Sequence, residues 1–355
     1  MTKWTKKSLV GLAVAGALGI TSGAAQATAL ANSIMDLSNF AFYNHAAGSA
    51  VGAELANGTN ITVLSFVSTG KAQSTLNGTP LSVSGTGPPI QNFLDIGPQC
   101  TSIAASKCTT DARLANNAFT AGIFTHGADP SYSVSSADQL ENGAPVDGIP
   151  AISGGGSLPN KAHVGAYGVT SVLDGNNGNS LAQNTLTSQF TFIADTGGIV
   201  DIDFNANAYL EAFSQAGKFG VGQASYSLSF KLVDNISPGV NITVFAWAPD
   251  GAVTAGGAPG GTEILDPFDL NATVTAAGPL GGQSFVGGAL GVKNTGEFQA
   301  ETGVLIAGHT YTLGIDMKTS TLAQAFVPVP EPGVLMLVGA GLLGLWGTRR
   351  RSLNS

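Results

Sequence analysis

Hydrophobic and polar residues alternate along several stretches of the second half of the chain. Between Ser225 and Leu232 every second residue is apolar, and serine or lysine fills the positions between them. The stretch from Ile199 to Phe213 shows the same alternation and places Asp201 and Asp203 among its polar members. Because successive side chains of a strand point to opposite faces, a period of two predicts strands with one face in a core.

Further segments with this pattern, separated by turns rich in Gly, Asn, Ser and Thr, predict an all-β fold. We expect strands at residues 36–43, 61–67, 189–193, 199–213, 225–232, 240–248, 270–275, 298–302 and 305–317. Strands at this spacing favour an antiparallel β-sandwich of jelly-roll-like type over residues 28–326. The chain shows no fixed repeat of about 20–50 residues, which argues against a solenoid.

The alternation weakens between residues 85 and 160, where prolines and the three glycines at 154–156 interrupt it. This pattern predicts a long loop-rich insertion with one short helix near residues 111–119. The insertion contains Cys100 and Cys108, which are the only cysteines of the sequence. In an exported chain such a pair favours one structural disulfide, and free or redox-active thiols are the alternative.

The first 27 residues have the form of a secretory signal peptide. Three lysines occur within the first seven residues, and an apolar stretch follows over residues 9–20. Ala25 and Ala27 then supply the small residues of a signal peptidase site. We expect cleavage at or near Ala27, with the Sec translocon and signal peptidase as partners. The apolar stretch is shorter than the roughly 20 residues of a stable membrane span, which argues against an N-terminal anchor.

The end of the chain carries three features in order. They are a turn of Pro330, Glu331 and Pro332, an apolar run over residues 334–346, and a basic cluster of Arg349, Arg350 and Arg351. The prolines cannot continue a helix, so the segment before the apolar run is expected to be extended. The run is shorter than the roughly 20 residues that a lasting membrane helix needs. Over residues 327–351 this tail resembles the PEP-CTERM sorting signal.

The resemblance implies a route for the chain and a partner for the tail. It implies recognition by an exosortase, after transient insertion of a short transmembrane sorting helix into the inner membrane through residues 333–348. It also implies a location in the envelope of a Gram-negative bacterium, on the outer surface or in the extracellular polysaccharide matrix of a biofilm after the tail is processed. It implies nothing about the fold of the β body.

The charge of the body between the two termini limits its partners. Three of the 14 basic residues lie in the leader and three in the tail, and one of the 22 acidic residues lies in the tail. The body therefore keeps 8 basic and 21 acidic residues, a formal net charge of −13. Phosphates would repel this charge, so we expect no nucleic-acid partner. Acidity that serves solubility is the plainest interpretation, and divalent cations or a hydrated polysaccharide are compatible with it.

The sequence contains no recognisable catalytic motif. A Gly-x-Ser-x-Gly nucleophile elbow, a His-Glu-x-x-His zinc motif and a phosphate-binding loop are all missing. The four histidines lie in separate segments and are expected to be surface or turn residues. We therefore predict no enzyme, no metal site and no cofactor, with calcium as a weak alternative.

Three residues are candidates for ligand binding. Asp201 and Asp203 share one strand face and could bind calcium or serve a glycosidase, although a solvated outer face is the interpretation we favour. Trp247 and Tyr209 are predicted on strand faces opposite the core, where exposed aromatic rings could stack on sugars. Burial of both rings under a second sheet is the interpretation we favour for them.

These observations favour a non-enzymatic surface or matrix protein that an exosortase sorts. The first alternative is a carbohydrate-binding or adhesive sandwich, with or without calcium, that uses Trp247. The second alternative is a secreted hydrolase that uses Asp201 and Asp203.

Overall fold

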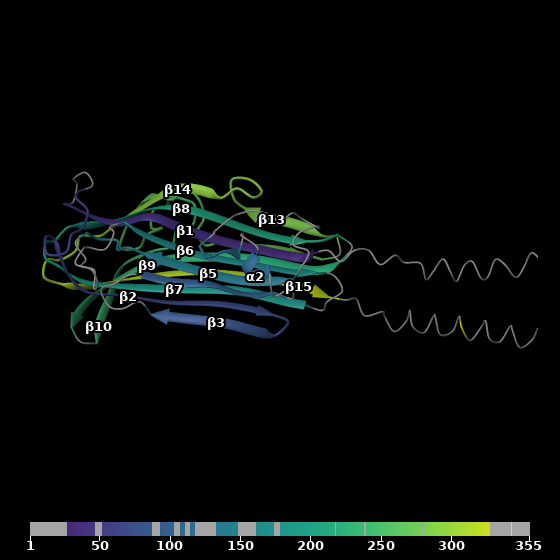
Figure 1. The fold of residues 1–355 in the computed structure, drawn as a ribbon. Helices are drawn as coiled ribbons and strands as arrows, with labels where there is room; N and C mark the ends of the chain where they lie inside the picture. The colour runs from purple at the N-terminus through teal and green to yellow at the C-terminus, as the bar shows by residue number, and fades with distance from the viewer. Residues whose placement is uncertain are drawn as a thin grey trace, which may run out of the picture.

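The computed structural model is a sandwich of two β-sheets, which Figure 1 shows stacked on each other. It describes residues 27–46, 52–86, 93–102, 107–110, 114–117, 133–147, 161–173, 178–216, 218–237, 239–278, 280–326 and 342. The sorting and processing residues Ala25, Pro330, Glu331, Pro332, Arg349, Arg350 and Arg351 lie outside these ranges, as does His126.

Strands make up most of the described residues. They are β1 (Ala27–His45), β2 (Ile61–Leu76), β3 (Thr79–Thr86), β4 (Phe93–Ser102), β5 (Val134–Asn142), β6 (Ala162–Leu173), β7 (Gly178–Ala194), β8 (Ile199–Ser214), β9 (Phe219–Ser237), β10 (Val240–Trp247), β11 (Gly261–Leu265), β12 (Thr273–Ala277), β13 (Gly282–Val286), β14 (Asn294–Thr302) and β15 (Thr310–Phe326). One short helix, α2 (Lys107–Thr110), follows β4.

The described strands form two antiparallel sheets, which confirms the predicted fold class. The first sheet has eight strands in the order β11-β14-β8-β1-β6-β5-β4, with β13 also on β8. The second sheet has seven strands in the order β10-β9-β15-β7-β2-β3, with β12 also on β9. The jelly-roll-like connection stays a prediction.

The core lies between the two sheets and is aromatic at its centre. The alternating sets predicted for β9 and β15 point inward as expected, and all eight residues are buried: Tyr226, Leu228, Phe230, Leu232, Tyr311, Leu313, Ile315 and Met317. Phe204 of β8 lies in the middle of this core. Its ring centroid is 5.1 Å from that of Phe298, 5.6 Å from Phe230 and 5.7 Å from Trp247.

A β-bulge in β1 changes which residues of this strand face the core. Before the bulge the odd-numbered residues Met35 and Leu37 lie in the core, and after it the even-numbered residues Phe40 and Phe42 do. The pairing with β8 shifts between Ser38 and Ala41. Asn39, inside the bulge, has a φ of 55°, a left-handed conformation that asparagine tolerates better than most residues. One extra residue therefore reverses the orientation of the rest of the strand.

The hairpin from β2 to β3 corrects one predicted boundary. A strand that ends near Ser68–Gly70 is expected from the sequence, whereas β2 continues to Leu76 because it pairs with β7 and β3 on its two sides. The turn is Asn77-Gly78, and both residues have positive φ values. An Asn-Gly pair between two strands is the strongest short-range hairpin signal, so the sequence did contain this turn.

Residues 85–160 contain more β-strand than the predicted loop-rich insertion. The strands β4 and β5 lie within this range and extend the first sheet beyond β6. The described helix α2 ends at Thr110, before the range 111–119 in which a helix is predicted, and only residues 114–117 of that range are described. The strands β3, β6, β11 and β13 have no counterpart among the predicted segments, and β12 begins three residues later than its predicted strand.

The outer face of the first sheet carries a second, smaller hydrophobic cluster, which we call the outer cluster. It consists of Leu30, Ile34, Leu114, Val134, Leu140, Tyr167, Val169 and Tyr209, with Cys100 and Phe213 packed against it. The first sheet is therefore buried on both faces in this region, which explains why Tyr209 is not exposed.

Replacement of Phe204 by alanine is expected to lower the free energy of unfolding by about 3–5 kcal/mol, because it removes a fully buried ring from the centre of the aromatic core. Urea unfolding followed by tryptophan fluorescence measures this loss. Phe219→Ala is the matched control, since Phe219 is 44% exposed and should change stability little. Equal effects of the two substitutions would contradict the packing described here.

Candidate functional site

The two ends of the β body lie at the same end of the sandwich. Ala29, near the start of β1, and Ala325, near the end of β15, belong to one buried cluster with Val172 and Ala323. Ala27, the expected cleavage position, is the first residue of β1. The chain segments that lead to the two processing signals therefore leave the body side by side.

The tail motif lies very close to this end of the body in sequence. Only residues 327–329 separate Phe326, the last residue of β15, from Pro330. Fully extended residues span at most about 3.6 Å each, so Pro330 lies within about 14 Å of the end of β15. Among the described helices, none is long and apolar enough to cross a membrane.

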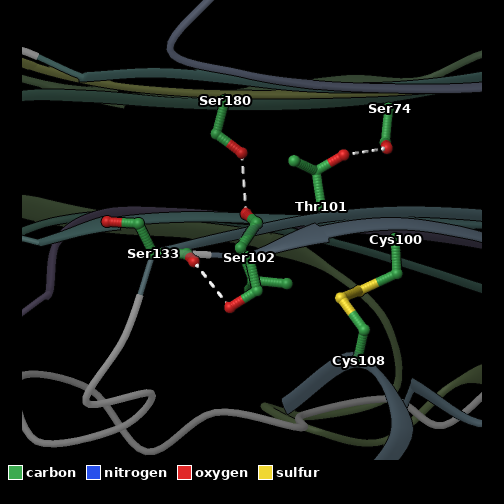
Figure 2. Close-up of a disulfide and its surroundings, with 8 residues drawn as sticks. Ser74, Cys100, Thr101, Ser102, Cys108, Ser133 and Ser180 are labelled. Atoms are coloured by element: carbon green, nitrogen blue, oxygen red, sulfur yellow. Dashed lines mark hydrogen bonds between the residues drawn. A yellow bond between two sulfur atoms is a disulfide. The ribbon is translucent and has the colours of Figure 1, made fainter. Parts of the chain in front are cut away.

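The predicted disulfide is present between Cys100 of β4 and Cys108 of α2, as Figure 2 shows. It ties α2 to the first sheet, and Cys100 packs against the outer cluster. Leu114, which follows α2, is buried in the same cluster. The bridge thus holds the start of this segment against the outer face of the sheet.

Serine and threonine side chains join the two sheets near the disulfide (Figure 2). Ser180 of β7 donates to the carbonyl of Val134 at 2.7 Å, and Ser74 of β2 lies 3.0 Å from the hydroxyl of Thr101. Ser135 of β5 likewise donates to the carbonyl of Leu181 at 2.6 Å. Near the disulfide the two sheets are therefore joined by directional hydrogen bonds, which fix how the sheets lie on each other.

The structure corrects the expectation that Asp201 lies on a solvated face. Both Asp201 and Asp203 lie on the face of β8 opposite the core, as predicted, but Asp201 is fully buried and Asp203 is half-buried. Each is opposite a β14 residue in the sheet, Glu301 for Asp201 and Gln299 for Asp203. Like charges directly opposite each other destabilise a sheet unless something compensates them.

Asp201 and Glu301 meet the imidazole of His45, the last residue of β1. The distance from His45 Nε2 is 3.4 Å to Asp201 Oδ1 and 3.5 Å to Glu301 Oε1. The His45 side chain is 4% exposed and that of Glu301 is 24% exposed. His45 is therefore not the surface residue that the sequence predicts. The bulge at Asn39 places it on the outer face, because odd-numbered residues point outward only after the bulge.

The surroundings of Asp201 disfavour its charged form. Burial raises the pKa of this carboxyl to about 6; His45 lowers it, and the nearby carboxylates of Glu301 and Asp203 raise it. Burial also raises the pKa of Asp203, with Glu297 adding to the effect. This end of the outer face is thus a region of concentrated negative charge.

A second group of carboxylates, Asp250, Glu263 and Asp266, lies around the loop after β10. Glu263 accepts hydrogen bonds from the indole Nε1 of Trp247 at 2.7 Å and from the backbone of Thr254 at 3.1 Å. Asp266 accepts from the backbone nitrogens of Asp250 and Gly251. These carboxylates bind parts of the protein itself and stabilise the loop.

Trp247 is part of the aromatic core. It is 2% exposed, and its ring stacks on Phe230 with centroids 5.3 Å apart. Sugar stacking on Trp247 finds no support, because both the ring face and the N–H group are already used. Trp247 also lines a groove of about 380 Å³ together with residues of β9, β10 and Pro259. Tyr209 is buried in the outer cluster and donates to Glu211 at 2.8 Å.

The other described histidines also lie beside carboxylates. His163 Nε2 is 2.6 Å from Asp36 Oδ1, and His309 Nδ1 is 2.9 Å from Asp234 Oδ2. These pairs join neighbouring strands of the sheets. The sequence did not predict them, since the partners are separated by 127 and 75 positions.

Comparison with known proteins identifies a motif in the tail. The chain carries a PEP-CTERM protein-sorting motif at residues 328–351. The motif implies recognition by an exosortase and export to the cell envelope or surface. Among curated proteins, no sequence matches this chain. A solved structure, described as that of infectious bursal disease virus Gx strain, is 11% identical over 90% of this chain and 87% of its own. Its TM-score of 0.09 indicates no similarity of fold.

Removal of the disulfide by the double substitution Cys100→Ser and Cys108→Ser is expected to lower the free energy of unfolding by about 2–3 kcal/mol, as closure of a short loop predicts. Denaturant unfolding measures the loss. A reducing agent should reproduce it in the unmodified chain and have no effect on the double variant. A double variant as stable as the unmodified chain would contradict a stabilising role for the bridge.

His163 is expected to titrate above its ordinary pKa of about 6.5, because the hydrogen bond to Asp36 outweighs the opposing effects of burial and of Lys293. A raised folded pKa stabilises the protein fully below the unfolded pKa, and this contribution disappears as the pH rises through the folded pKa. NMR titration of the imidazole protons measures the midpoint.

Asp36→Asn should lower this midpoint, while Asp316→Asn should leave it unchanged, since Asp316 accepts only from Thr187 on another part of the surface. An unchanged midpoint in the Asp36→Asn variant would show that the hydrogen bond to Asp36 does not control the titration of His163.

Proposed function

We propose that this chain is a non-enzymatic surface or matrix protein, sorted by an exosortase through its C-terminal signal and retained in extracellular polysaccharide. The observation that carries the proposal is the sorting motif at residues 328–351. In the proposed sorting motif, the exosortase recognises the turn of Pro330, Glu331 and Pro332. The apolar run holds the chain in the inner membrane, and the three arginines at 349–351 stay on the cytoplasmic side.

The arrangement of the body supports this route. Both signals join the sandwich at the same end, so the body can stand on one membrane face while each end is cut. The short spacing after Phe326 brings the cut next to the folded sandwich. After both cuts, little more than the folded body is left.

The body itself has properties of a stable passive domain. Its long strands, its disulfide and its interior hydrogen bonds favour persistence outside the cell. A formal charge of −13 suits a hydrated matrix more than an anionic membrane surface. Of the proposed hydrolase residues, Asp201 is fully buried and lies beside His45 and Glu301, which leaves it poorly placed to reach a substrate.

Replacement of Pro330, Glu331 and Pro332 by alanine tests the sorting route. The unmodified chain should lose the tail in cells that contain an exosortase and appear at the surface at its shorter mass. The triple variant should keep its tail and stay in the inner-membrane fraction, because the recognised turn is gone. Cell fractionation followed by mass analysis of the protein measures both properties.

Two comparisons make the result specific. A variant with Leu353→Ala and Asn354→Ala changes the same tail outside the matched residues and should be processed normally. Deletion of the exosortase gene should reproduce the triple variant. Surface display and tail removal that persist in the triple variant would refute exosortase sorting.

A further inference from the structure

His45, Asp201 and Glu301 form a compact group of three donor atoms on the outer face of the first sheet. Each residue offers one atom, and these atoms all lie within 4.8 Å of one another. They come from the end of β1, the start of β8 and the end of β14. Within the first sheet, β8 lies between the other two strands, so Asp201 is at the centre of the group.

The two distances from His45 fit the edges of a metal coordination tetrahedron. Nitrogen and oxygen ligands lie about 2.0–2.2 Å from zinc, and two ligands of a tetrahedral site are therefore about 3.4 Å apart. His45 Nε2 is 3.4 Å from Asp201 Oδ1 and 3.5 Å from Glu301 Oε1. Charge-assisted hydrogen bonds between nitrogen and oxygen are shorter, at about 2.7–2.9 Å. The observed spacing thus suits an ion between the atoms better than a shared proton.

Buried polar atoms in the group lack hydrogen-bond partners. Neither oxygen of Asp201 has one, although the residue is 0% exposed, and His45 Nε2 has none either. A buried carboxylate without a partner is costly, so such groups are normally paired or bind a metal ion. These orphaned atoms are the second, independent sign of a ligand.

The tautomer of His45 points in the same direction. Its Nδ1 lies 3.1 Å from the backbone carbonyl oxygen of Ala46, which can only accept a hydrogen bond. A hydrogen is therefore on Nδ1, so in the neutral form of the ring the lone pair of Nε2 is on the side of the two carboxylates. Three electron-rich atoms that face one another repel unless a cation lies between them. Metal-binding histidines generally have this second hydrogen bond, which fixes the ring.

We propose that His45, Asp201 and Glu301 bind a divalent transition-metal ion of the zinc type. One imidazole and two carboxylates suit zinc and related ions, whereas calcium prefers six to eight oxygen ligands. The two carboxylates balance the charge of the ion. The side chain of Glu301 is 24% exposed, so the ion reaches the site from this side and a water molecule or an external ligand completes its coordination. Bound metal joins β1, β8 and β14 at one end of the first sheet.

Zinc binding to the full chain tests the proposal. The protein is purified in detergent without a polyhistidine tag, because a tag would bind zinc itself, and is stripped with a chelator. Equilibrium dialysis with zinc chloride and elemental analysis should then find one ion per chain that excess calcium does not displace. Cobalt, which reports coordination in its visible spectrum, should show intense absorption bands typical of a tetrahedral site.

Matched variants assign the site. His45→Gln and Glu301→Gln should each weaken zinc binding at least tenfold, and zinc should no longer raise the melting temperature. His163→Gln removes another histidine that lies beside a carboxylate and should bind zinc like the unmodified chain. If His45→Gln fails to fold, the Glu301→Gln variant still tests the site. Glu301 is partly exposed, so this variant should fold, and circular dichroism can confirm that it does.

Two outcomes overturn the proposal. One is an unmodified chain that binds no stoichiometric zinc, which would mean that a protonated His45 supplies the positive charge. The other is zinc binding that the folded Glu301→Gln variant retains or that the His163→Gln variant loses. Neither outcome affects the sorting route, which the tail alone controls.

Discussion

The bulge in β1 is the constraint on which the rest of the structure depends. β1 lies between β8 and β6 in the middle of the first sheet, so its side chains reach both the core and the outer face. A strand alternates strictly, and one extra residue at Asn39 exchanges the two faces for all residues that follow. The bulge lets Phe40 and Phe42 complete the aromatic core and turns His45 outward, toward Asp201 and Glu301.

The sandwich is stabilised differently in its two halves. Around Phe204 the sheets pack through aromatic rings, whose attraction depends little on direction. Near the disulfide they meet through hydroxyl groups such as those of Ser180 and Ser74, whose bonds need defined geometry. The aromatic rings fill the core around Phe204, and the hydroxyl hydrogen bonds fix the relative position of the sheets near the disulfide. The disulfide holds α2 against the outer face of the first sheet, where Cys100 packs against the outer cluster.

The position of the chain ends connects this architecture with the sorting signal. β1 and β15 belong to different sheets, yet Ala29 and Ala325 contact the same small buried cluster. On the proposed route, a body held at this end would present the rest of its surface away from the membrane. The proposed metal site on the outer face of the first sheet belongs to the body and stays with it when the tail is removed.

The sequence by itself determined the local properties of this protein. Alternation of period two is a property of neighbouring residues, so it predicted the inward faces of β8, β9 and β15 correctly, and the pair Cys100 and Cys108 predicted its own bridge. The tail motif was equally readable, because its turn, apolar run and arginines are contiguous.

Only the tertiary structure decided the lengths of the strands, since β2 continues to Leu76 through pairing with β7 and β3. It also decided the burial of Trp247 and the meeting of His45 with Asp201 and Glu301. These depend on which strands lie side by side and on a single bulge, and residues about a hundred or more positions apart carry no local signal of their contact.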